Sequence, residues 1–193
     1  MVDKEKCVNK AIQLGTVNYS KYNNCAQATF TAIIDALKEE GITITSAEAE
    51  EAIFNSLAGV SGGHANMGTG NCGALTGAVA AISLASNVSR AMQLTDKENR
   101  WIAFDNVAKT VVIRFKNEFY GLTCRDVTWK RNGKIWDIWD PEANENFLFE
   151  KKKLDPAANC IVSMIAGWGT DYVIEALENP RTLEQIKKDH NLV

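Results

Sequence analysis

The sequence predicts an all-α fold: a single-domain helical bundle over residues 1–193, with one small β-hairpin near residues 127–139. Three observations support this fold class. Apolar residues recur at helical spacing along most of the chain. Glycine, proline and N-cap residues mark the ends of these periodic segments. The chain has 193 residues, 46% of them hydrophobic and 23% charged, which is typical of one ordinary domain.

Apolar spacing and capping residues define the first three helices. We expect one helix over about residues 4–14 and a second over residues 24–40. A third begins at Thr45 or Ser46, because either hydroxyl can cap a segment with acidic residues in its first turns. Gly59 closes this helix.

A glycine-rich loop over residues 60–71 separates the third helix from a fourth, expected over residues 72–85. The fourth helix is apolar on all sides, which is typical of a helix in the middle of a bundle. Gly73 and Gly77 lie four residues apart on one face of it. We therefore expect a neighbouring backbone to approach this face closely.

The second half of the chain predicts a long helix and then the hairpin. The long amphipathic helix spans residues 96–120. The dipeptide Asn132-Gly133 is a strong two-residue hairpin signal, and a turn there would place Trp129 opposite Trp136. A short β excursion is therefore expected after the long helix.

The last long helix is predicted over residues 155–179. Asp155 is a good N-cap and Pro156 suits the first turn, which would place Cys160 on the second turn. Pro180 ends the helix. We expect a short polar helix to follow it.

Charge and hydropathy exclude two classes of partner. The formal net charge of −3 gives no attraction for nucleic acid or for anionic lipid. No apolar stretch reaches the roughly 18 to 20 residues that a membrane span requires. The charged amino-terminal residues show no export signal, so we expect a cytoplasmic protein. The sequence leaves open whether the protein forms a homo-oligomer.

Five cysteines without an export signal argue against a secreted disulfide scaffold. Cys25, Cys72, Cys124 and Cys160 stand far apart, and Cys7 is expected to be a partly buried free thiol. Metal ligands, redox thiols and small buried side chains all remain open for the four.

Cys25 and Cys72 fall at predicted helix N-termini, where the helix dipole favours a thiolate and lowers its pKa. The spacing of the cysteines contains no C-x-x-C pair, so a zinc ribbon and a bacterial ferredoxin motif are absent. No C-x-x-C-H motif is present either, and haem is therefore not expected.

The run Cys72-Gly73-Ala74-Leu75-Thr76-Gly77 directly follows the glycine-rich loop. It is the central motif of a resemblance to the family of redox-active proteins named for the pattern C_GCAxxG_C_C. The resemblance covers roughly residues 5 to 180. Its other parts are Asn24 to Ala28 around the first cysteine, residues 56–63, Met67-Gly68, Arg114-Phe115 and Phe119 before Cys124, and Cys160 in the last long helix.

The resemblance implies a helical fold and an iron–sulfur cluster or redox thiols at Cys25, Cys72, Cys124 and Cys160. It also implies electron transfer or redox sensing with a redox partner protein. The split-Soret cytochrome c is a relative that combines such a domain with haem, but the haem motif is missing here. Whether the chain turns over a substrate stays open.

A cluster would give the neighbouring glycines a role. Gly62, Gly63 and Gly70 lie in a loop whose backbone N–H groups could reach cluster sulfurs, and Gly73 and Gly77 could make room for the cofactor. The same residues also suit a flexible connector and helix packing. His64 is either an additional ligand or proton carrier, or a solvated loop residue.

Two alternatives to a cluster remain. The four cysteines could form a cofactor-free thiol–disulfide oxidoreductase, which requires two sulfurs within bonding distance and one lowered pKa. They could also be buried side chains in a structural or interaction protein.

Overall fold

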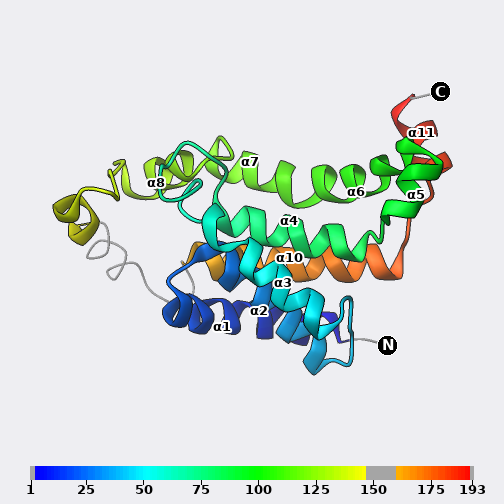
Figure 1. Ribbon diagram of the computed structural model, residues 1–193, viewed down its shortest axis with the longest axis horizontal. Coiled ribbons are helices and arrows are strands. Elements are labelled where there is room, and N and C mark those ends of the chain that lie inside the picture. Colours follow the sequence, from blue (N-terminus) through cyan, green and yellow to red (C-terminus); the bar gives the residue numbers. More distant parts are fainter. Residues whose placement is uncertain (1–2, 147–159, 192–193) are drawn as a thin grey trace.

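The protein, described by a computed structural model over residues 3–146 and 160–191, is helical throughout (Figure 1). Within these two ranges β pairing is limited to an isolated bridge between Asn71 and Thr123. The all-α prediction is therefore confirmed. No helix in the described ranges is both long and apolar enough to cross a membrane.

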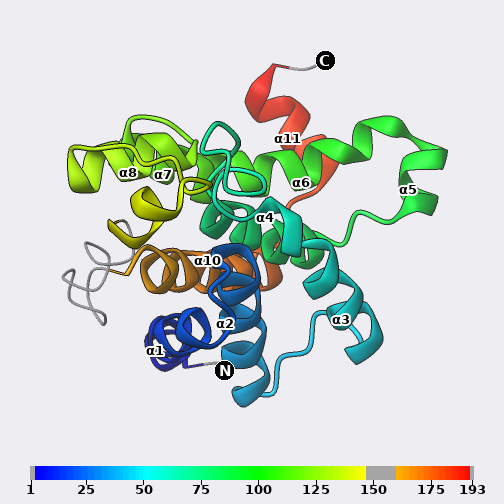
Figure 2. The same cartoon turned by 60° about the vertical axis from the view of Figure 1, so that its left-hand side comes forward.

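Four helices form the core: α1 (Lys4–Tyr22), α2 (Cys25–Glu39), α4 (Gly73–Ala85) and α10 (Ile161–Glu178). The last of these, α10, contacts each of the other three, and α2 packs between α1 and α4 (Figures 1 and 2). Their facing side chains are fully buried, among them Phe30, Ile33, Leu75, Ile82, Ile165 and Val173.

The first helix is longer than predicted because it continues through Gly15. A β-carbon on Gly15 would lie 2.7 Å from the Cα of Ser163, so glycine here allows α1 to lie close to α10. The second helix matches its prediction, with the Asn24 side chain accepting hydrogen bonds from two backbone N–H groups. Ser46 caps the short α3 (Ala47–Ser56), also as predicted.

The close approach predicted for Gly73 and Gly77 is confirmed, and α2 is the neighbour. A β-carbon on Gly77 would overlap the carbonyl oxygen of Ala26 and would lie 3.0 Å from the nitrogen of Phe30. A β-carbon on Gly73 would overlap the sulfur of Cys25. This face of α4 therefore depends on glycine for its contact with α2.

The helix predicted over residues 96–120 is divided into several pieces. These are the 3₁₀ turn η2 (Lys97–Asn99), α6 (Arg100–Val107), the π-helical turn η3 (Ala108–Val112) and α7 (Ile113–Phe119), and a separate helix that was not predicted, α5 (Arg90–Thr95), precedes them. The Asp96 side chain caps η2, so the earlier α5 ends there. From α6 to α7 the ribbon runs along α4 without a break (Figure 1).

The β-hairpin predicted near residues 127–139 is wrong, because the chain forms α8 (Cys124–Asn132). Thr123 and Asp126 form a capping box that starts this helix. Gly133 adopts φ +62° and donates its N–H to the Trp129 carbonyl at 2.8 Å. The Asn132-Gly133 signal therefore marks a helix C-terminus, where left-handed glycine is equally favoured.

The long helix α10 begins at Ile161, and Cys160 is its N-cap rather than a residue of its second turn. The start predicted at Asp155-Pro156 lies outside the described residues. After Pro180 the chain forms the predicted short polar helix, α11 (Leu183–His190), which begins with a second capping box.

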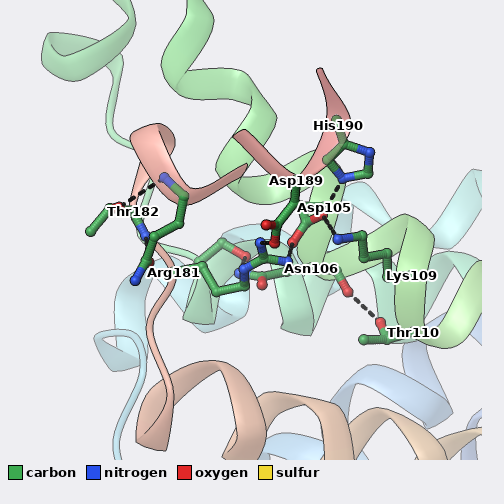
Figure 3. Close-up of polar contacts among 10 residues, drawn as sticks. Asp105, Asn106, Lys109, Thr110, Arg181, Thr182, Asp189 and His190 are labelled. Carbon is green, nitrogen blue, oxygen red and sulfur yellow. Dashed lines mark hydrogen bonds and ion pairs between the residues drawn. The ribbon is translucent and has the colours of Figure 1, made fainter. Parts of the chain in front are cut away.

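A buried carboxylate attaches α11 to α6. The side chain of Asp105 is only 3% exposed and accepts from Arg181 at 2.7 Å, His190 at 2.8 Å and Lys109 at 2.9 Å. Figure 3 shows these three side chains converging on the carboxylate, with Asp189 paired to Arg181 beside it. This network holds the end of the bundle where α5 and α11 lie.

Candidate functional site

The four cysteines singled out in the sequence all lie at helix N-termini. Cys25 is the first residue of α2 and Cys124 the first residue of α8, whereas Cys72 and Cys160 are the N-caps of α4 and α10. We call these four residues the cysteine site. The helices α2, α4, α8 and α10 all begin toward the left-hand end of the molecule in Figure 1.

Helix N-termini concentrate unpaired N–H groups and partial positive charge, which stabilise an anion placed there. Four such ends face one region, so the fold favours negative charge there more than a single helix could. The sequence predicted this position for Cys25 and Cys72. It placed Cys160 on the second turn of its helix instead of at the N-cap. It missed Cys124, although the capping-box pattern Thr123-x-x-Asp126 is a signal that could have located this residue.

Without a metal ion, two of these thiols are held in the protonated form. Burial raises the pKa of Cys72 far above its usual value, and the charges of Cys25 and Cys124 raise it further. Burial likewise raises the pKa of Cys124 to about 12. The N–H groups of Leu75 and Ala74 lower the pKa of Cys72, as predicted for a helix start, but burial outweighs them.

Two residues that the sequence did not suggest belong to the same region. The pKa of Tyr19 is raised well above its usual value, first by burial and then by the charges of all four site cysteines. Burial lowers the pKa of Arg131, and the negative charges of Cys160, Glu118 and Cys72 oppose that change. A phenol and a guanidinium therefore share the electrostatic field of the thiols.

The segment of residues 61–71, which we call the glycine loop, contains five consecutive residues with positive φ. They are Gly62, Gly63, His64, Ala65 and Asn66, with φ between 46° and 72°. Each non-glycine residue in this conformation costs about 1 to 2 kcal/mol, and such residues normally occur singly. The surrounding contacts must therefore hold a short left-handed turn in place.

Hydrogen bonds within the loop and from outside it stabilise this turn. The N–H of Ala65 donates to Gly59 at 2.8 Å, that of Asn66 to Ser61 at 3.1 Å and that of Gly68 to Gly62 at 2.9 Å. The Trp139 indole N–H donates to the carbonyl of Ala65 at 2.9 Å. Several loop N–H groups that were candidates for cluster sulfurs are thus occupied by carbonyl oxygens.

The glycine loop contacts two of the site cysteines directly. The Ser61 hydroxyl lies 3.1 Å from the sulfur of Cys25 and accepts the N–H of the same residue. The Cys124 N–H donates to the Gly70 carbonyl at 3.1 Å, and a β-carbon on Gly63 would lie 2.9 Å from that of Cys124. The loop therefore fixes the N-terminus of α8 relative to that of α2.

A third cysteine is tied to α8 at the end of the loop, where the Cys72 N–H donates to the carbonyl of Leu122 at 2.8 Å. Together with the loop contacts, this bond leaves little freedom between the starts of α4 and α8. The isolated bridge at Asn71 lies in the same place.

The two other residues considered in the sequence, His64 and Cys7, lie outside the cysteine site. His64 is exposed, and its ring packs against Gly70, where a β-carbon would lie 2.7 Å from the ring. Cys7 is fully buried in α1 rather than partly buried as predicted, and its thiol donates to the Ala36 carbonyl at 3.4 Å. Burial raises the pKa of Cys7 to about 11.

Within residues 3–146 and 160–191, no three His, Cys, Asp or Glu side chains lie close enough together to hold a metal ion as they stand. The donor set nevertheless suits an iron–sulfur cluster, because cysteine thiolates are its usual ligands and helix N-termini suit its negative charge. The absence of a side chain at Gly73 lets the Cys25 sulfur lie directly against the start of α4. Binding would require the sulfurs to move toward one another.

Comparison with known proteins gives one match. The model of the family described as "Putative redox-active protein (C_GCAxxG_C_C)" matches residues 23–168, which include all four site cysteines. No curated protein and no solved structure matches the chain.

Proposed function

Because this chain belongs to the C_GCAxxG_C_C family of redox-active proteins, we propose that its cysteine site binds an iron–sulfur cluster for electron transfer or redox sensing. The observation that carries the proposal is the placement of four cysteines, distant in sequence, at four helix N-termini at one end of the bundle.

The surrounding residues suit an anionic cofactor. The helix N-termini supply positive potential to the thiolates and to cluster sulfide. Arg131 adds a full positive charge in the field of Cys160 and Cys72. The Ser61 hydroxyl, next to the Cys25 sulfur, can donate a hydrogen bond to a thiolate there, and such outer contacts tune a bound metal site.

The raised pKa values of Cys72 and Cys124 imply that metal binding to the cysteine site depends on pH. Thiols with raised pKa values must lose their protons when they bind a metal, so binding releases protons and becomes tighter as the pH rises. A bound cluster supplies the one-electron chemistry. The protein orients the ligands, partly excludes water and balances the charge.

The test is a visible absorption spectrum of protein purified without oxygen, with iron and acid-labile sulfide measured on the same sample. We expect broad absorption near ~400 nm and matching amounts of iron and sulfide. Each of the variants Cys25→Ser, Cys72→Ser, Cys124→Ser and Cys160→Ser should lose most of this absorption. Cys7→Ser is the matched control, because Cys7 is buried outside the site.

A colourless protein that takes up no iron after anaerobic reconstitution would overturn the cluster. Reversible formation of a disulfide between two of the four cysteines would then support the thiol oxidoreductase, and inert thiols would support a structural role. Equal loss of iron in Cys7→Ser and in the site variants would indicate unfolding rather than loss of a ligand. Circular dichroism of each variant separates these cases.

A further inference from the structure

An exposed aromatic and basic surface lies beside the cysteine site. It combines the outer side of α8 with neighbouring residues of the glycine loop and of the end of α7. We call it the α8 face, and its residues are Met67, Tyr120, Arg125, Trp129, Lys130 and Lys134.

The apolar members of this face are unusually open to solvent. The exposed fraction is 59% for Met67, 78% for Tyr120 and 61% for Trp129. Side chains of this size seldom project into water together unless they meet a partner, and aromatic residues often anchor protein interfaces. The α8 face therefore has the composition of an interface.

Contacts and helical spacing join five of the six residues, and the sixth, Lys134, follows the C-cap of α8. The Arg125 N–H donates to the Gly68 carbonyl at 3.0 Å, which places it beside Met67, and its side chain packs on Gly68. Trp129 is one helical turn after Arg125. The ammonium of Lys130 lies 4.3 Å from the centre of the Tyr120 ring.

The charge of the surface is opposite to that of the whole chain. The six residues of the α8 face include three cations, Arg125, Lys130 and Lys134, and no carboxylate, whereas the protein has a net charge of −3. The acid next to Arg125, Asp126, is engaged in the capping box of α8. The acidic stretch that follows begins with Asp137, whose carboxylate accepts the N–H of Trp139.

The surface adjoins the site through α8 itself. Cys124 and Arg125 are consecutive residues, so the helix that presents the α8 face also carries a site cysteine at its N-terminus. Arg131, on the same helix, lies in the field of Cys160 and Cys72. A protein bound to the α8 face would therefore be separated from the site by a single helix.

We propose that the α8 face is the docking surface for an acidic redox protein that carries a one-electron centre. This proposal rests on the proposed function, because it names the partner of the cysteine site. One electron leaves the reduced centre of one protein, which is oxidised, and enters the centre of the other, which is reduced. No proton or chemical group is transferred.

Charge and shape favour an acidic protein over the other candidates. A nucleic acid would find few phosphate contacts, because the α8 face offers only three exposed cations. A second copy of the same face would bring like charges together. Aromatic anchors ringed by cations instead match an apolar patch ringed by carboxylates.

The experiment measures binding of a purified acidic [2Fe–2S] ferredoxin by calorimetry at low and high ionic strength. The test variant is Lys130→Glu/Lys134→Glu, and the matched control is Lys97→Glu/Lys188→Glu. Both pairs change the net charge by the same amount. Lys97 and Lys188 are exposed, and they belong to η2, which follows α5, and to α11. The helices α5 and α11 lie at the end of the molecule opposite α8 (Figure 1).

We expect the unaltered protein and the control to bind the ferredoxin, with affinity that falls as salt rises. The test variant should bind about tenfold more weakly or worse, because charge reversal in an interface weakens electrostatic association. Trp129→Ala should weaken binding at both ionic strengths, since it removes an apolar contact. A basic c-type cytochrome should bind more weakly than the ferredoxin to the unaltered protein.

The proposal is overturned if the ferredoxin does not bind at low ionic strength, if both charge variants weaken binding equally, or if an oligonucleotide binds better than the ferredoxin. Self-association that the test variant abolishes, without ferredoxin binding, would identify the face as a homodimer contact. Iron is assayed on every variant. If the ferredoxin binds to a protein that takes up no iron, the cluster is refuted but the docking surface is not. Electron transfer measured by stopped flow tests the cluster and the docking surface together.

Discussion

The sulfur of Cys25 lies directly against Gly73, so close that a β-carbon on residue 73 would overlap it. The contact joins the first residue of α2 to the first residue of α4, and therefore sets the separation of two site cysteines. A substitution at Gly73 would be strained by the steric overlap of its β-carbon with this sulfur, and not by the backbone conformation of residue 73.

Gly73→Ala should therefore displace the Cys25 thiol. We expect the free energy of unfolding to fall by about 1 to 3 kcal/mol, as for other overpacked positions, and iron affinity to fall at least about tenfold. Urea unfolding and iron titration measure the two effects. Gly59→Ala is the control, because a β-carbon there meets no atom within 4 Å. Similar losses in both variants would show that the contact with Cys25 is unimportant.

The left-handed turn of the glycine loop gives a second prediction. Gly63 has φ +72° and Gly41 has φ +76°, so alanine should cost about 1 to 2 kcal/mol at either position from the backbone alone. Only at Gly63 would the new β-carbon also crowd Gly68 and Cys124. Gly63→Ala should consequently lose more stability than Gly41→Ala in urea unfolding. Equal losses would mean that the loop adapts without moving α8.

Cys7 predicts a loss of stability in alkali. Its folded pKa of about 11 lies above the reference value of 9.0, because burial and the charges of Glu40 and Glu39 disfavour the thiolate. The unfolded chain therefore loses this proton first. The protonated Cys7 thiol makes its full contribution to the free energy of unfolding below about pH 9, and this contribution is lost as the pH rises toward 11.

Comparison of the protein with Cys7→Ala isolates this effect from other titrations. The stability difference between the two should shrink between pH 8.5 and pH 11 by at most about 2 to 3 kcal/mol, because each pKa unit is worth about 1.4 kcal/mol. Unfolding curves at several pH values measure it. A difference that is independent of pH would show that the thiol is not protected as the structure describes.

Asp105 predicts a loss of stability in acid. Burial raises its pKa, but hydrogen bonds from His190 and Lys109 and the charge of Arg181 outweigh burial, so the pKa lies below its usual value. Asp105→Asn should destabilise the protein by about 1 to 3 kcal/mol near neutral pH, less than a fully buried pair would, because the cations are partly exposed.

The effect of Asp105→Asn should be constant above about pH 4 and should disappear as the pH falls through the lowered pKa, since a protonated Asp105 no longer attracts the cations. Asp189→Asn is the control, because Asp189 is 55% exposed and contacts the same Arg181. It should cost less than about 1 kcal/mol. An equal cost at both positions would contradict the importance of the buried carboxylate.

The sequence predicted the helical architecture well because helix ends carry local signals. Ser46 was one of the two predicted caps and acts as predicted, and Asn24, where the second helix was expected to begin, is a cap of equally recognisable chemistry. The error at Asn132-Gly133 arose because left-handed glycine ends a helix as readily as it turns a hairpin. The capping box at Thr123 decides between the two outcomes.

The site was harder to predict, because its geometry depends on contacts between distant segments. Ala65 carries no signal for a left-handed turn, which is held by bonds to Gly59, Ser61 and the indole of Trp139. Tyr19 and Arg131 join the thiols only through the packing of α1 and α8. The direction of each thiol pKa shift likewise depends on burial. The position of a cysteine in a helix does not reveal how deeply it is buried.

The division of the four cysteines among four helices constrains the order in which the protein matures. The cysteine site is absent from the unfolded chain, because its members lie far apart in sequence and meet only when α2, α4, α8 and α10 are assembled. A cofactor that needs all four can therefore be fully ligated only when these helices are assembled, so its binding free energy stabilises the folded chain over the unfolded one. Its incorporation would then cross-link helices that no disulfide bond joins.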